Sequence, residues 1–208
     1  MRILIADDHS IVRRGLKDIL REEFPFAEII EVGDAADLLM KIAGESWDIA
    51  ISDLSMPGRT ALEVLPEIKQ QAPDLPVLIL SMYPEEQYAI RALKAGAAGY
   101  LNKDLAPDEL INAVRRVISG RKYITSSIAE KLADFSIRNE KKSVHEQLSD
   151  REFEVMKLLA AGKSVSDIAL MFHLSATTVS TYRARILKKM DKKTNADLTL
   201  YAITHQLI

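Results

Sequence analysis

The stretch that decides the fold reads Asp48-Ile49-Ala50-Ile51-Ser52-Asp53-Leu54-Ser55-Met56-Pro57-Gly58. Its apolar run predicts a short buried strand that ends at the carboxylate of Asp53, and Pro57-Gly58 then turns the chain. In an open parallel sheet, ligands bind beyond the carboxyl ends of the strands, so Asp53 would stand at a binding edge. A single Asp in this place caps the next helix or turn equally well. The residues that converge on Asp53 decide between the two roles.

Length and composition allow one large or two small domains. The chain has 208 residues, of which 48% are hydrophobic. It has no Cys, which excludes disulfides, thiolate metal sites and cysteine nucleophiles. No apolar run approaches the roughly 20 residues of a membrane helix, and Asp7-Asp8 interrupts the first apolar segment too early for a secretion signal. We therefore expect a cytoplasmic protein without a membrane partner.

The net charge of −2 hides an asymmetry between two parts of the chain. Residues 1–146 carry 19 Lys and Arg against 24 Asp and Glu, a net charge of −5, whereas residues 147–208 carry nine against six, a net charge of +3. Most of the later basic residues fall between Arg183 and Lys193. A basic segment behind an acidic domain predicts a polyanionic partner for the second part. A solvated helix face is the commoner meaning of such a charge run.

Short apolar runs alternate with amphipathic segments over the first 120 residues. The expected strands lie near residues 2–6, 29–32, 49–52, 76–81 and 98–101. The expected helices begin near Ser10, Asp34, Ala61, Glu85 and Pro107, with Ser10 as a candidate N-cap of the first. The buried face of the first helix would consist of Ile11, Leu16, Ile19 and Leu20. Pro66 should kink the third helix or shift its start. The alternation predicts an α/β fold, a five-stranded parallel sheet in the flavodoxin-like order 2-1-3-4-5.

This strand order brings polar side chains from several strand ends to one crevice, namely Asp7, Asp8, Asp53, Ser81 and Lys103. Three carboxylates in one crevice raise one another's pKa unless a cation joins them. Mg²⁺ prefers such oxygen ligands together with water and a phosphate. A carboxylate is then the best-placed nucleophile, because aspartyl phosphate is established protein chemistry. In the alternative interpretation the acids are separate helix caps and Lys103 is a surface residue.

The crevice residues resemble the receiver domain of bacterial two-component response regulators. The resemblance covers residues 1–120 and includes Met56-Pro57-Gly58 and Tyr100. It implies that Asp53 accepts a phosphoryl group from a histidine kinase, with Lys103 binding a phosphoryl oxygen. The Mg²⁺ ligands that it implies are Asp7 (mostly through water), Asp8, Asp53 and the backbone carbonyl of Ser55.

The same resemblance implies a switch and only limited catalysis. Ser81 would be the switch hydroxyl and Tyr100 the aromatic residue that turns inward behind it. The chain departs from the family at Lys103-Asp104, where Lys-Pro is usual, and at Arg59-Thr60-Ala61, where a glycine is common. Self-phosphorylation with Mg²⁺ and slow autodephosphorylation would be its only reactions. The rival reading, an Asp-nucleophile phosphohydrolase, needs a second acid just after the nucleophile, where Leu54-Ser55 has none.

Residues 121–146 are expected to link this domain to a second one. Helical spacing of apolar residues predicts a helix near 125–137, and the polar stretch 139–146 predicts a flexible hinge. His145 and the other His residues lack metal-ligand spacing, so we assign them no function.

The segment 147–208 predicts a small all-α domain. Ser149 and Glu152 form a capping box for its first helix, and Ser164 or Ser166 caps the second. The third helix, from Ser175 to about Met190, is basic. Two helices joined by a short turn, the second of them basic, predict a helix-turn-helix whose second helix lies in the major groove.

This segment resembles the LuxR-type DNA-binding domain of the NarL/FixJ subfamily. The resemblance rests on the order Leu148…Arg151-Glu152…Gly162…Ile168-Ala169…Leu174-Ser175…Thr178-Val179…Lys188-Lys189-Met190. Ser180 and Tyr182 replace residues common in that family, so we expect a different base preference. The last helix, near 195–205, would serve dimerisation or simply close the small core. The expected DNA contacts are Thr177, Thr178, Ser180, Thr181, Arg183, Arg185, Lys188 and Lys189.

These observations predict a phosphorylation-controlled DNA-binding transcription regulator. Its expected partners are a sensor histidine kinase, double-stranded promoter DNA and a second copy of the chain, at least when phosphorylated. The alternative is a DNA-binding protein whose receiver is only a scaffold.

Overall fold

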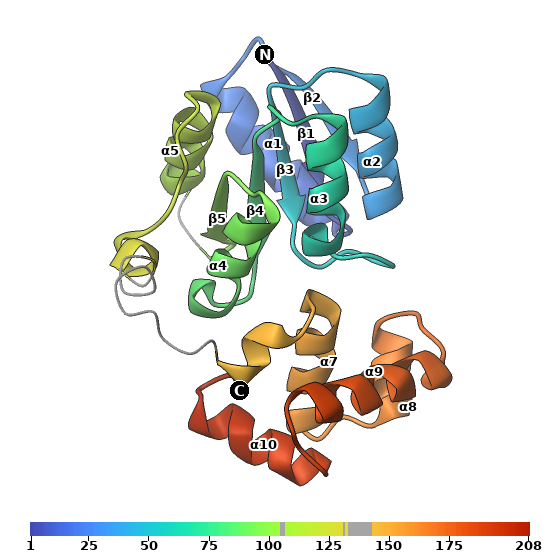
Figure 1. Ribbon diagram of the computed structural model, residues 1–208. Coiled ribbons are helices and arrows are strands. Elements are labelled where there is room, and N and C mark those ends of the chain that lie inside the picture. The colour runs from blue at the N-terminus through green and yellow to red at the C-terminus, as the bar shows by residue number, and fades with distance from the viewer. Residues whose placement is uncertain (105–106, 131, 133–142) are drawn as a thin grey trace. The chain divides into compact units, whose positions relative to one another are not determined.

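The computed structural model describes residues 1–104, 107–130, 132 and 143–208 (Figure 1). The chain divides into two compact units, Met1–Arg138 and Asn139–Ile208, and each is described by itself.

The first unit is built on a parallel sheet in the order β2-β1-β3-β4-β5. Its strands are β1 (Arg2–Ala6), β2 (Glu28–Val32), β3 (Ile49–Asp53), β4 (Val77–Ser81) and β5 (Gly99–Asn102). In the register, Ile5 lies beside Ile51, and Ile51 lies beside Leu78. β3 and β4 are buried along their whole length, as parallel strands covered on both faces must be. The predicted fold class and strand order are confirmed.

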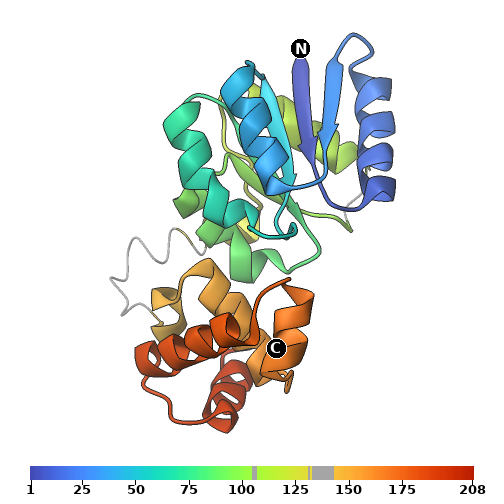
Figure 2. The same cartoon turned by 90° about the vertical axis from the view of Figure 1, so that its right-hand side faces the viewer.

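Helices cover both faces of this sheet (Figures 1 and 2). They are α1 (Ser10–Glu23), α2 (Ala35–Gly44), α3 (Ala61–Gln71), α4 (Glu85–Ala95) and α5 (Pro107–Ile118). α1 packs beside α5, and α3 packs between α2 and α4. The carboxyl ends of the strands therefore lie together at one edge of the sheet, where the loops to the helices begin.

Two details of the predicted helices were wrong. Ile11 is not on the buried face of α1, since its side chain is 86% exposed. Ile11 precedes Leu16 by five residues, which places it about 140° away around a helix of 3.6 residues per turn. Ser10 is the first helical residue rather than the cap, because His9 takes the N-cap position.

Pro66 does not shift the start of α3. Thr60 and Glu63 form a capping box that fixes the helix start at Ala61: Thr60 Oγ1 accepts from the Glu63 N–H at 3.3 Å, and Glu63 Oε2 accepts from the Thr60 N–H at 2.8 Å. The proline lies inside the continuous helix. Its ring therefore removes one backbone donor without ending the helix.

The second unit is helical. Its elements are the 3-10 turn η1 (Val144–Gln147) and the helices α7 (Asp150–Ala160), α8 (Val165–Met171), α9 (Ala176–Lys189) and α10 (Asn195–Thr204). α7 packs against both α9 and α10, and α8 packs against α9. A capping box starts α7 at Ser149, as predicted, and Ser164 rather than Ser166 caps α8.

The linker predictions fall partly outside the described residues. Of the expected helix near 125–137, residues 126–130 are helical, while 131 and 133–137 are not described. Of the expected hinge 139–146, only residues from Ser143 onward are described, and these form a capped turn instead of an unpatterned hinge. The turn is fastened by a 2.9 Å hydrogen bond between His145 Nδ1 and Tyr201 Oη of α10.

None of the helices in the described part of the chain combines the length and the apolar character needed to cross a membrane.

Candidate functional site

Lys103 lies between two buried carboxylates at the carboxyl edge of the sheet. Its Nζ is 2.6 Å from Oδ2 of Asp7 and 3.1 Å from Oδ2 of Asp53. The Asp7 and Asp53 residues are 0% and 6% exposed. Asp7 follows β1, Asp53 ends β3 and Lys103 follows β5. Residues distant in sequence meet here because the parallel strands all end at this edge.

The charges at this edge are not balanced. Burial raises the pKa of the Asp53 carboxyl; Lys103 opposes that rise, and the charge of Asp7 adds to it. Burial acts to lower the pKa of Lys103, but its bonds to Asp7 and Asp53 outweigh burial and hold that pKa above its ordinary value. One ammonium thus lies against the carboxylates of Asp7 and Asp53, and Asp8 adds a third carboxylate close to them. A further cation would stabilise their charged forms.

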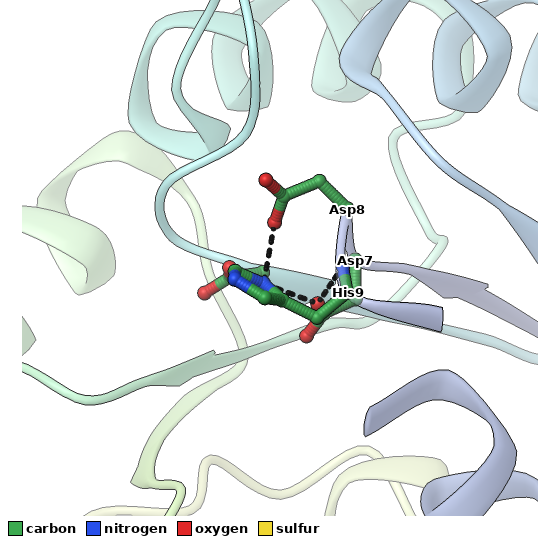
Figure 3. A group of neighbouring side chains, drawn as sticks. Asp7, Asp8 and His9 are labelled. Carbon is green, nitrogen blue, oxygen red and sulfur yellow. Dashed lines mark hydrogen bonds and ion pairs between the residues drawn. The ribbon is translucent and has the colours of Figure 1, made fainter. Parts of the chain in front are cut away.

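A cation would find several ligand atoms here. Asp7, Asp8, His9 and Asp53 each offer one ligand atom, and these atoms lie within 4.8 Å of one another; Figure 3 shows the first three. Ser55, whose N–H donates to Asp53, has a buried Oγ without a hydrogen-bond partner among the described residues. This oxygen-rich set fits a hard divalent cation such as Mg²⁺, and the unpartnered hydroxyl fits an additional polar group beside Asp53.

Ser81 and Tyr100 hold the loop after β4 from two sides. Ser81 Oγ accepts from the Tyr83 N–H at 3.0 Å, and the Tyr100 hydroxyl donates to the Tyr83 carbonyl oxygen at 2.8 Å. The side chain of Tyr100 is turned inward, with only 2% of the residue exposed, and its burial raises its pKa. The Tyr83 ring stacks on Tyr88 of α4 with centroids 5.0 Å apart. The hydroxyl of Ser81 and the ring of Tyr100 are therefore coupled through one short loop.

His9 is the site residue that the sequence analysis missed. Its Nδ1 lies 2.8 Å from Oδ1 of Asp8 and 3.4 Å from Oδ1 of Asp7. The available signal was its position directly after Asp7-Asp8. Spacing among the His residues had no bearing on it, because its partners at this site are carboxylates.

α9 differs from its neighbours in the charge of its first turn. α7, α8 and α10 each carry an acidic residue there, whereas α9 carries none and has Lys188 and Lys189 in its last turn. Ser175 caps α9, with Oγ accepting from the Thr178 N–H at 3.0 Å. The first turn of α9 thus carries no carboxylate of its own to offset the positive end of the helix dipole, which suits an anion such as a phosphate.

The residues expected to contact DNA fall into two groups. Thr177, Ser180, Thr181, Arg185 and Lys188 are exposed along α9. The other three are engaged within the unit: Thr178 Oγ1 lies 2.8 Å from Ser175 Oγ, Arg183 Nε donates to Asn195 Oδ1 at 2.7 Å, and Lys189 Nζ donates to Glu152 Oε2 at 2.6 Å.

Glu152 joins the last turn of α9 to the start of α7. The residue is 3% exposed, and its carboxylate accepts from the Ser149 N–H at 2.8 Å as well as from Lys189. Burial acts to raise its pKa, but the bonds to Lys189 and Ser149 prevail and hold the pKa below its ordinary value. Glu152 therefore has two functions: it is the acid of the α7 capping box, and it forms an ion pair with Lys189 that joins α7 to α9.

Comparison with known proteins follows the same division. The model of the family described as "Response regulator receiver domain" matches residues 3–115, and that described as "Bacterial regulatory proteins, luxR family" matches residues 146–202.

Response regulator UvrY of Escherichia coli (strain K12) is 34% identical over 208 residues, covering 100% of this chain and 95% of that protein. Oxygen regulatory protein NreC of Staphylococcus carnosus (strain TM300) is 33% identical over 215 residues, covering 100% and 99%. The structure of RcsB from Salmonella enterica serovar Typhimurium, bound to promoter rprA in the presence of phosphomimetic BeF3-, matches with a TM-score of 0.64, 25% identity and 97% coverage of each chain.

Proposed function

This chain belongs to the two-component response regulators that join a receiver domain to a LuxR-type DNA-binding domain, and we propose which of its residues carry that function. It is a phosphorylation-controlled transcription regulator and not an enzyme in the usual sense. Its receiver domain implies a histidine kinase as partner. The placement of Lys103 Nζ within 2.6 Å and 3.1 Å of Asp7 and Asp53 is the observation that carries the residue assignments.

In this proposal Asp53 is the phospho-acceptor. A carboxylate oxygen of Asp53 attacks the phosphorus, the P–N bond of the kinase phosphohistidine breaks, and the departing imidazole takes up a proton. The Lys103 ammonium neutralises charge on a phosphoryl oxygen. Asp8, Asp53 and the Ser55 carbonyl would hold Mg²⁺, with Asp7 acting through water. When bound, the ion supplies further charge neutralisation in a site where burial already strains the Asp53 carboxylate.

Ser81 and Tyr100 transmit the change. Ser81 Oγ, which accepts from the Tyr83 N–H, would instead donate to a phosphoryl oxygen on Asp53. The hydrogen bond from the Tyr100 hydroxyl to the Tyr83 carbonyl ties the ring to the same loop, so the loop and the ring shift together. The result is a change in the populations of two arrangements of one fold.

The output is DNA binding by α9. Its unneutralised amino end and the exposed residues Thr177, Ser180 and Thr181 would approach bases and phosphates, and Arg185 and Lys188 would contact phosphates. Related solved structures include an RcsB–DNA complex and two RcsB dimers bound to two parallel DNAs. By that similarity, two copies of this chain present two α9 helices to promoter DNA.

The test compares the wild-type chain with Asp53→Asn, using Asp104→Asn as the matched control at an exposed carboxylate. With a small-molecule phosphodonor and Mg²⁺, mass spectrometry should find one added phosphoryl group on the wild type and on Asp104→Asn, and none on Asp53→Asn. Affinity for DNA selected from a random pool should rise with phosphorylation only in the first two. If Asp53→Asn leaves the phosphodonor response of DNA affinity unchanged, Asp53 is not the control point and the receiver is a scaffold.

A further inference from the structure

We propose that His9 adds an imidazole nitrogen to the cation site of Asp7, Asp8 and Asp53, which raises the affinity of the site for transition-metal ions, Mn²⁺ among them, relative to Mg²⁺. The inference rests on the proposed phospho-acceptor function, because it concerns the same site. An imidazole nitrogen suits transition-metal ions, whereas Mg²⁺ prefers oxygen ligands and water.

The spacing of the ligand atoms carries the proposal. Neighbouring ligands of an octahedral ion with bonds of about 2.1 Å stand roughly 3 Å apart. His9 Nδ1 is 2.8 Å from Asp8 Oδ1 and 3.4 Å from Asp7 Oδ1, which brackets that value. In Figure 3 the imidazole is directed at the Asp8 carboxylate, with Asp7 beside it. The ligand atoms of His9, Asp7 and Asp8 all lie within 4.8 Å of one another, so one cation can reach His9 and Asp8 directly while Asp7 acts through water.

The backbone holds His9 in this place from both sides. Its N–H donates to Asp7 Oδ1 at 2.8 Å, and its carbonyl oxygen accepts from the Arg13 N–H at 3.1 Å. His9 is the N-cap residue of α1, yet its side chain makes no capping hydrogen bond. The imidazole therefore does not stabilise the start of α1 by a hydrogen bond, and replacing it removes no capping interaction.

The two carboxylate oxygens of Asp7 face different groups of the site. Oδ2 of Asp7 lies 2.6 Å from Lys103 Nζ, whereas Oδ1 faces His9. A cation on the His9 side would therefore avoid the ammonium on the other side, as repulsion between like charges requires. The simpler alternative is an exposed contact between His9 and Asp8 without a metal, since the His9 side chain is 67% exposed; such a surface pair contributes little to stability.

The experiment uses the full chain and Mn²⁺ alone as the probe. Pulsed electron paramagnetic resonance of bound Mn²⁺ reports a directly coordinated imidazole through the nuclear spin of its nitrogen, and titrations give the dissociation constants for Mn²⁺ and Mg²⁺. His9→Asn keeps an oxygen donor and a good N-cap. His173→Asn is the matched control, because His173 is exposed and its φ of 53° lies in the region that Asn tolerates.

The wild type and His173→Asn should show the nitrogen signal, and His9→Asn should lose it. His9→Asn should also weaken Mn²⁺ binding on the order of tenfold, the lower end of the loss usual when one supporting group of a metal site is removed, while Mg²⁺ binding changes much less. Bound Mn²⁺ without a nitrogen signal, or with a signal that survives in His9→Asn, would overturn the inference. Normal phosphorylation of Asp53 in the same samples would show that the proposed function stands regardless.

Discussion

At the scale of single residues, the receiver site is shaped by how many charges it confines. Asp7 and Asp53 are buried, and one ammonium, Lys103, lies within 3.1 Å of both. Burial raises the pKa of Asp53 despite that ammonium. The folded receiver thus holds the carboxylate that we propose as the acceptor under electrostatic strain, which a bound cation would relieve. This strain should lower the stability of the folded receiver when no cation is bound.

This strain predicts a pH-dependent gain in stability for Asp53→Asn. A folded-state pKa above the unfolded value of 3.8 means that ionised Asp53 costs stability, and the cost grows as the pH rises through the folded pKa. Without divalent cations, Asp53→Asn should therefore be more stable than the wild type at pH 7, and the advantage should shrink as the pH falls. Urea unfolding across this range, in chelator and in Mg²⁺, measures the difference.

Mg²⁺ should stabilise the wild type more than Asp53→Asn, because it binds the native site. Asp104→Asn, at an exposed neighbour, should stay within about 0.5 kcal/mol of the wild type at every pH. Equal stabilities of the wild type and Asp53→Asn in chelator would contradict the picture of a strained carboxylate.

At the scale of elements, the helices of the DNA-binding unit are set by caps and by one interhelical ion pair. Capping boxes start α7, α8 and α10, while α9 starts on Ser175 without an acidic partner. The pair between Lys189 and Glu152 ties the last turn of α9 to the first turn of α7. The basic residues of α9 are therefore not equivalent, although they are neighbours in sequence.

Lys188→Gln and Lys189→Gln should separate a contribution to DNA binding from a contribution to the stability of the fold. Lys189→Gln leaves the Glu152 carboxylate buried without its ammonium, and should lower the free energy of unfolding by about 2 kcal/mol. We take this moderate value because the Lys189 side chain is itself 41% exposed. Lys188→Gln should change stability by less than about 0.5 kcal/mol, but should reduce the salt dependence of DNA binding by about one phosphate contact.

Denaturant unfolding and DNA titrations at several salt concentrations measure both effects. A reduced salt slope in Lys189→Gln with unchanged stability would show that Lys189 serves DNA and that its bond to Glu152 is incidental.

At the scale of the whole molecule, the proposed function requires that a phosphate on one unit control a helix on the other. In the proposal, phosphorylation favours dimers, and two α9 helices then bind two half-sites together. The charge asymmetry between the acidic and the basic part of the chain confines attraction for DNA to the second unit.

Dimeric docking predicts a dependence on half-site spacing. Phosphorylated chain should bind two half-sites best when their centres are about 10 base pairs apart, one helical turn. Inserting about five more base pairs turns the second half-site to the opposite face of the DNA, and should reduce affinity to that of a single half-site. Mobility-shift titrations of both DNAs measure this. Asp53→Asn should not distinguish them, and equal affinity of the phosphorylated wild type for both would argue against a dimer of this geometry.

Much of this architecture is readable in the sequence, because its signals are local. Apolar runs of strand length, amphipathic helices and the capping pair Ser149-Glu152 act within a few residues of one another. The strand order then follows from parallel connectivity and handedness, which place Asp7, Asp53 and Lys103 at one edge before any contact is known. The family resemblance of both parts rests on the same residues.

Other features depend on where distant residues pack. Lys189 is expected from the sequence to contact a DNA phosphate, but in the structure it donates a hydrogen bond to Glu152, 37 residues away in sequence. The sequence shows His9 only as an isolated histidine, whereas the structure places its ring beside the carboxylates of Asp7 and Asp8. Periodicity and connectivity were enough to predict the two domains and the residues that meet at the sheet edge. Packing then settled which charged groups are paired and which stay available, because pairing depends on distances that local sequence does not encode.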